Sequence, residues 1–159
     1  DTGDAYVTRS ENFSKDPKKT LDFIRKQEAR GGGDYPEAVH TALEKALQDL
    51  SWEEGNYARL AFLLLDAPPH HNQEVMESIR KSIETYAANG IKLIPIAASG
   101  IDKNTEFLLR LMAIFTDGTY VFITNHSGIG NDHIEPTIGQ YQVELLNELI
   151  VRLIGEYTE

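Results

Sequence analysis

Two aspartates stand where carboxylates could meet a metal ion. Asp66 directly follows the apolar run at residues 60–65 (LAFLLL), and Asp34 follows the three glycines at 31–33. Ligands gather at the carboxyl edge of a parallel sheet, so an aspartate that ends a buried strand is well placed to bind a cation. Each residue also has a structural role open to it. Asp66 can accept hydrogen bonds from amides of the following loop, and Asp34 can cap the next helix.

Two neighbouring histidines extend this acidic set, because His70 and His71 follow Asp66 closely. A metal-dependent hydrolase using Asp34, Asp66, His70 and His71 is one hypothesis, but no nucleophile or general base accompanies them. Zinc is not expected, since it needs three or four convergent ligands and adjacent side chains rarely face one ion. The chain also lacks a nucleophile elbow, a phosphate-binding loop and a dinucleotide fingerprint.

The elements that must position these residues alternate between strand-like and helix-like periodicity. This alternation predicts an α/β fold, a mainly parallel sheet with helices on both faces. Strands are expected at 5–13, 60–65, 91–98 and 118–122, the second of them buried on both faces. Helices are expected from Pro17 to about Arg30, after Asp34, over 73–88, over 105–115 and from about Gln142. Pro95 suggests a bulge or a sheet edge, and residues 127–141 form a long polar loop.

Apolar residues at helical spacing are expected to face the core. They are Leu21 and Ile24; Val39, Ala42, Leu43, Ala46, Leu47 and Leu50; Val75, Ile79, Ile83 and Tyr86; Phe107, Leu108, Leu111 and Met112; Val143, Leu146, Leu149, Ile150 and Leu153.

The net charge of the chain limits the kinds of molecule that it is expected to bind. The chain carries 25 acidic and 15 basic residues, a net charge of -10. This charge argues against nucleic acid and anionic membrane surfaces, and it suits cations or basic protein patches. No stretch approaches the roughly 20 apolar residues of a membrane-spanning helix. Cysteine is absent, which excludes disulfides and thiolate chemistry and leaves the compartment open.

Several motifs taken together carry a family resemblance. Residues 31–39 read GGGDYPEAV and residues 62–70 read FLLLDAPPH, followed by ASGI at 98–101 and TDGTY at 116–120. Over nearly its whole length the chain resembles a von Willebrand factor type A domain of the microbial and alpha-kinase-associated branch. The resemblance implies a Rossmann-like, doubly wound fold. It also implies a protein-binding or adhesion-type module rather than an enzyme, located in the bacterial envelope or outside the cell.

The resemblance also implies a metal-ion-dependent adhesion site at the carboxyl edge of the sheet. Asp66 corresponds to the aspartate of the family's third loop. The second loop lacks the family's threonine, and Asp34 or a water is expected to take its place. Hard oxygen ligands suit Mg²⁺ or Ca²⁺, and an acidic group of a protein partner would complete the shell. A purely structural interaction domain with a degenerate metal site is the alternative.

The chain departs from the family pattern at its start. The first metal-binding loop, Asp-x-Ser-x-Ser after the first strand, has no counterpart in residues 1–159. We therefore expect a single domain that lacks one or more N-terminal strands. In the family the first strand lies beside the strand that ends at Asp66, so residues 60–65 would present an open apolar edge. A neighbouring copy, another segment or a rearranged sheet is expected to fill it.

Overall fold

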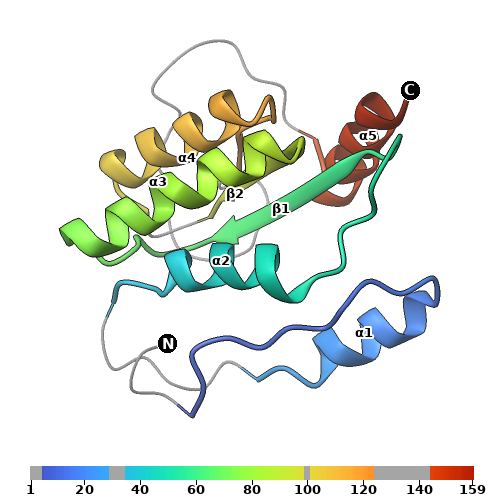
Figure 1. The fold of residues 1–159 in the computed structure, drawn as a ribbon, viewed down its shortest axis with the longest axis horizontal. Coiled ribbons are helices and arrows are strands. Elements are labelled where there is room, and N and C mark those ends of the chain that lie inside the picture. The colour runs from blue at the N-terminus through green and yellow to red at the C-terminus, as the bar shows by residue number, and fades with distance from the viewer. Residues whose placement is uncertain (1–4, 29–34, 99–100, 124–143) are drawn as a thin grey trace. The chain divides into compact units, whose positions relative to one another are not determined.

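The computed structural model describes residues 5–28, 35–98, 101–123 and 144–159. Within these ranges (Figure 1) the helices are α1 (Pro17–Arg25), α2 (Val39–Asp49), α3 (Gln73–Ala88), α4 (Lys103–Phe115) and α5 (Leu146–Thr158), and the strands are β1 (Arg59–Leu65), β2 (Ile91–Ala97) and β3 (Val121–Phe122). The chain divides into two compact units, Asp1–Glu53 with Pro69–Ser82 and Glu54–Pro68 with Ile83–Glu159. The single domain over 1–159 stays a prediction.

The three strands form one parallel sheet in the order β1-β2-β3. Pairing of β1 with β2 runs without a break from Arg59 opposite Ile91 to Leu65 opposite Ala97. Parallel strands need a crossover connection, and here α3 links β1 to β2 while α4 links β2 to β3. The predicted α/β class is therefore confirmed.

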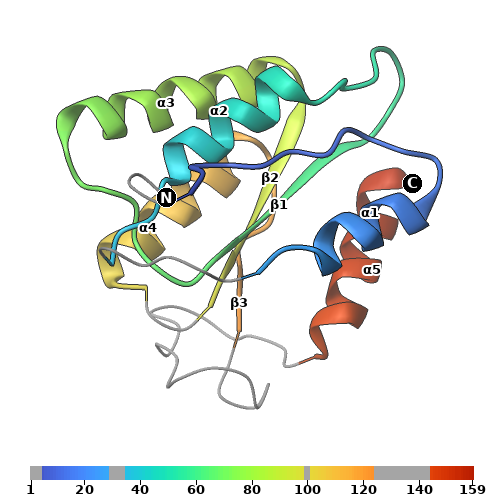
Figure 2. The same cartoon turned by 90° about the horizontal axis from the view of Figure 1, so that it is seen from below.

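The core of the second unit lies between the sheet and α5. Leu153 of α5 is buried with Ile94 and Ile96 of β2 and Val121 of β3, and Leu60 and Phe62 of β1 pack against this cluster. Alternate residues of a strand share one face, which is why Leu60 and Phe62 of β1 lie on the same side of the sheet as Ile94 and Ile96 of β2. Figure 2 shows α4 on the opposite side of the sheet from α5.

The predicted helix over 73–88 is confirmed as α3, with the same bounds. Val75, Ile79, Ile83 and Tyr86 are all buried, as their spacing predicts. Asn89 and Gly90 follow the last turn, and Gly90 has a φ of 63°, a conformation that glycine adopts without steric cost.

The predicted strand at residues 5–13 is wrong, because this segment forms no regular element. It is held by side chains instead. The Asn12 side-chain amide donates to Ser51 Oγ at 2.8 Å, and the Phe13 ring meets Trp52 edge-on with centroids 5.0 Å apart. Trp52 Nε1 donates to the Ala46 carbonyl at 2.8 Å. Aromatic and β-branched residues favour a strand only where a partner strand is present.

The predicted inward faces of two helices also need correction. The first helix ends at Arg25 rather than near Arg30, and it buries no residue, so Leu21 and Ile24 are exposed. In α4 Phe107 is 63% exposed, and Leu109 is buried together with Met112. Helical spacing identifies an apolar face of the helix, but tertiary contacts decide which of its residues are buried.

The helix predicted after Asp34 is α2, and its buried stripe is narrower than expected. Val39 and Leu43 are buried, Ala46, Leu47 and Leu50 are partly buried, and Ala42 is exposed. In α5, which begins at Leu146, Leu153 is buried and Leu149 and Ile150 are partly buried. Leu146 is exposed, contrary to its predicted inward position, because it lies in the first turn of the helix. Val143 and the predicted loop at 127–141 lie outside the described residues.

The strand before Asp66 is confirmed, but its predicted burial on both faces is wrong. Only Leu65 is buried, and Leu64 is 61% exposed. Among the described residues β1 pairs with β2 alone and so lies at one edge of the sheet. The expectation that a neighbouring copy or another segment covers this edge remains a prediction.

Pro95 lies in the middle strand and causes neither a bulge nor an edge, contrary to the sequence prediction. Ala98 N donates to Leu65 O, and Ile123 N donates to Ala97 O, both at 2.8 Å. Because strand amides alternate between two neighbours, the nitrogen of Pro95 faces the β3 side. Pairing with β3 begins only at Ile96, so no ladder bond is lost at the proline.

The end of α4 is fixed to β2 by a tight backbone contact. Gly118 N donates to Ala113 O at 2.8 Å and Asp117 has a φ of 53°, the geometry of a Schellman cap. Thr116 Oγ1 accepts from Leu93 N at 2.9 Å. A Cβ added at Gly118 would lie 1.9 Å from the Leu93 carbonyl oxygen.

The substitution Gly118→Ala should therefore lower the free energy of unfolding by about 3 kcal/mol, because the new methyl group must displace backbone. The control is Gly155→Ala in α5, where an added Cβ meets nothing within 4 Å. That variant should gain about 0.5–1 kcal/mol from helix propensity. Urea unfolding measures both, and equal stability of the two variants would contradict the contact.

The buried side chain of Tyr86 makes the free energy of unfolding depend on pH in the alkaline range. Burial raises the pKa of Tyr86 to about 12 from 10.0. Its contribution to stability is complete below pH 10 and is lost as the pH rises toward 12, because the unfolded chain ionises first. Between pH 10 and 11 the wild type should lose about 1 kcal/mol relative to Tyr86→Phe in urea unfolding. If the free energies of unfolding of the two proteins changed in parallel with pH, the Tyr86 phenol would ionise as readily in the folded chain as in the unfolded chain.

Candidate functional site

Asp66 lies at the carboxyl edge of the sheet, as the sequence predicts for a residue that follows a parallel strand. It follows Leu65, which pairs with Ala97, and the 2.8 Å bond from Ala98 N to Leu65 O closes the ladder beside it. The side chain is exposed. Within the described part of the chain its carboxylate has no hydrogen-bond or ion-pair partner. The alternative role, accepting bonds from loop amides, is therefore not seen among the described residues.

The second predicted ligand, Asp34, lies outside the described residues, as do Ser99 and Gly100. The predicted cap at Asp34 is nevertheless wrong, because α2 begins at Val39 and its N-cap position is Ala38, with no side-chain cap. The backbone of Glu37 forms a parallel bridge with Pro69 instead. This pairing keeps the chain extended past Pro36, so the helix starts later than local capping signals indicate.

The structure brings together no complete set of metal ligands in the ranges that it describes. No group of three or more His, Asp or Glu side chains there could hold a metal ion. Of the two predicted histidines, His71 is exposed, whereas His70 lines a cleft formed with α2. The hypothetical hydrolase set includes Asp34, which lies outside the described residues, so that alternative stays a prediction.

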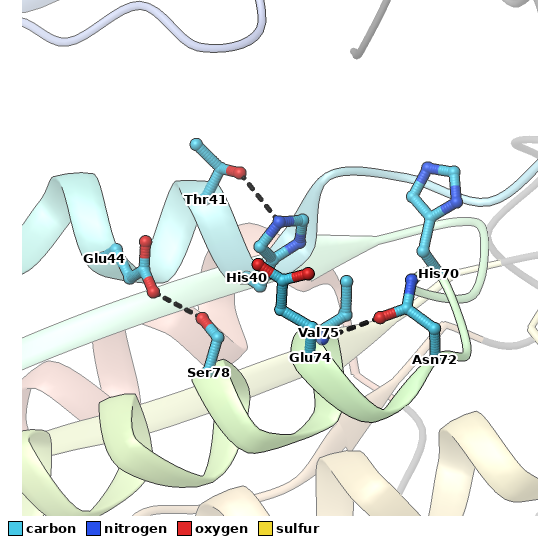
Figure 3. A pocket seen from close by; sticks show the side chains of 8 residues that line it. All are labelled: His40, Thr41, Glu44, His70, Asn72, Glu74, Val75 and Ser78. Carbon is cyan, nitrogen blue, oxygen red and sulfur yellow. Dashed lines mark hydrogen bonds between the residues drawn. The ribbon is translucent and has the colours of Figure 1, made fainter.

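The cleft that contains His70 lies wholly within the first unit (Figure 3) and has a volume of about 460 Å³. Its lining comes from α2, from the turn before α3 and from the first turns of α3. The residues are His40, Thr41, Glu44, His70, Asn72, Glu74, Val75 and Ser78. Within the described part of the chain, two carboxylates line this space and no lysine or arginine does.

Helical spacing and one hydrogen bond explain how these side chains converge. His40 and Glu44 are four residues apart on α2, as Glu74 and Ser78 are on α3, so each pair shares one helix face. Ser78 Oγ donates a hydrogen bond to Glu44 Oε1 across the cleft. His40 Nε2 lies 3.2 Å from Thr41 Oγ1. Its other ring nitrogen, Nδ1, is buried and has no hydrogen-bond partner within the described chain.

Asn72 fixes the position at which α3 begins. Its Oδ1 accepts a hydrogen bond from Val75 N at 2.9 Å, and its backbone carbonyl accepts from Met76 N at 3.0 Å. These are the two bonds of an N-cap residue. The cap places Glu74 in the first turn, beside the wall formed by α2.

This cleft was not predicted from the sequence. The sequence points to His70 only as a metal ligand beside Asp66, and it does not single out His40 or Glu44. The available signal was weak: a histidine and a glutamate at i and i+4 on the polar side of α2. Such pairs are common on solvated helix faces, and the partner residues lie about 30 positions further along the chain.

Comparison with models of known protein families and with curated proteins found no match for the chain. Among the residues that the structure describes, no helix has the length and apolar character to cross a membrane.

Replacement of the cap residue tests this local geometry. Asn72→Ala should lower the free energy of unfolding by about 1 kcal/mol, because the amide of Val75 loses its acceptor. Asn72→Asp retains an acceptor oxygen and should stay close to the wild type. Thermal or urea unfolding distinguishes the two, and equal losses in both variants would show that the amide side chain acts in some other way.

Proposed function

We propose that this protein is a binding module of the von Willebrand factor A type. In this proposal the carboxyl edge of a doubly wound sheet holds Mg²⁺ or Ca²⁺, and the cation grips an acidic group of a partner protein. Asp66 is a direct ligand and Asp34 a second one. The module has no catalytic role of its own.

The observation that carries this proposal is the state of Asp66. Its carboxylate is exposed at the end of β1, next to the end of the paired strand β2, and it is engaged with no other described residue. A carboxylate that only anchored the following loop would accept hydrogen bonds from that loop. One that awaits a ligand keeps its oxygens available.

The chemistry of this edge suits a hard cation. Mg²⁺ and Ca²⁺ take oxygen ligands, and Mg²⁺ usually keeps several waters and needs only one or two protein carboxylates. An acidic partner group can replace one of these waters. The net charge of -10 favours cation binding, and it makes an acidic partner dependent on the bridging ion, since the two surfaces repel each other without it.

Metal titration tests the proposal directly. Isothermal calorimetry with Mg²⁺ and with Ca²⁺ should show saturable binding that weakens at least about tenfold in Asp66→Asn, an isosteric change that removes the charge. The matched control is Glu54→Gln, since Glu54 is also exposed but lies before β1. It should leave the affinity unchanged.

Two outcomes would count against the proposal. Silence of the wild type toward both ions would remove the cation-dependent mode. Partner binding that persists in a chelator would favour a structural interaction domain with a degenerate metal site.

A further inference from the structure

The cleft between α2 and α3 has a lining of one charge sign. Glu44 and Glu74 supply two carboxylates, and no lysine or arginine is among the lining residues that the structure describes. Basic side chains on the same helices are engaged away from it: Lys45 pairs with Asp49, and Arg80 pairs with Glu77. Two carboxylates without a basic residue in the described lining favour a positively charged occupant.

The carboxylate of Glu44 is partly buried and is held in place by the hydroxyl of Ser78. A hydroxyl supplies one donor, whereas a carboxylate has about four acceptor positions. A partly buried anion with a single neutral donor is incompletely compensated. Glu74 is exposed and pairs with no other described residue, so its full charge also faces the cleft.

His40 contributes an unpartnered ring nitrogen. Its Nε2 meets the hydroxyl of Thr41 at 3.2 Å, and its buried Nδ1 has no partner among the described residues. When Nε2–H donates to Thr41, Nδ1 carries a lone pair and can only accept. A ligand that donates hydrogen bonds would satisfy this nitrogen, whereas an anion would meet acceptors on every side.

We propose that this cleft binds an organic cation of the alkylammonium or alkylguanidinium class, with Glu44 and Glu74 neutralising its charge and His40 accepting one of its hydrogen bonds. Among the residues that the structure describes, the acidic and imidazole groups of the cleft do not form a group of three or more metal ligands. A volume of about 460 Å³ accommodates a butyl chain with its charged head. The site does not include Asp66 and is independent of the cation-bridged function.

Binding of four matched probes tests the charge requirement. n-Butylammonium and n-butylguanidinium are compared with n-butanol and n-butyrate by two-dimensional amide NMR of the wild-type protein. The cations should bind at least about tenfold more tightly than butanol, because a charge-assisted hydrogen bond replaces a neutral one. Shifts should centre on α2 and the first turns of α3, and added salt should weaken binding. Equal binding of butyrate or butanol would overturn the proposal.

Isosteric variants test the residues. Glu44→Gln and Glu74→Gln should each weaken n-butylammonium binding about fivefold or more. Glu77→Gln is the matched control, because Glu77 is an exposed glutamate of α3 outside the lining, and it should change binding less than twofold. If all three variants weakened binding equally, the effect would come from the overall surface charge, and the site would be refuted. Tight Zn²⁺ binding without any binding of the amine would refute it as well.

The same assay distinguishes a free amine from a partner's side chain. The probes are short peptides, acetylated and amidated, with one lysine or one arginine between glycines. Tighter binding of a peptide than of the corresponding butyl cation identifies the basic side chain of a protein partner as the occupant. Equal or weaker binding of the peptide identifies a free small-molecule amine or guanidine.

Discussion

The in-register pairing of β1 with β2 is the interaction on which the carboxyl edge depends. An unbroken ladder from Arg59 to Leu65 fixes where both strands end, so Asp66 and Ala98 leave the sheet side by side. A slip of one residue would turn every side chain of β1 to the other face and would take Leu60 and Phe62 away from the helix that covers them. The register of β1 against β2 therefore fixes both the position of Asp66 and the packing of the core.

Sequence alone predicted the elements whose signals are local and repeated. The apolar period of α3 and the Asn89-Gly90 stop give that helix its correct bounds, and the apolar run gives β1. Burial was predicted less well, because exposure depends on which neighbours are present. The composition of residues 5–13 favours a strand, yet side-chain bonds such as that of Asn12 to Ser51 hold it in an irregular conformation.

The candidate site residues also differ in how well the sequence predicted them. Asp66 could be predicted because its place follows from the end of one strand. The cap at Asp34 failed because the bridge between Glu37 and Pro69 joins segments far apart in sequence and delays the helix. The cleft escaped detection because its walls come from two such segments, and no short motif links His40 to Glu74.

The packing of Trp52 against Phe13 gives the first compact unit its own spectroscopic reporter. Trp52 is the sole tryptophan of the chain and belongs to the first unit, where its indole N–H is bonded to the Ala46 carbonyl. Intrinsic fluorescence excited at the red edge of indole absorption therefore follows the loosening of that unit alone. The seven tyrosines are distributed over both units, so the ultraviolet difference spectrum of the phenols follows the unfolding of the whole chain. Melting curves recorded through the two chromophores coincide only if the units open as one cooperative body.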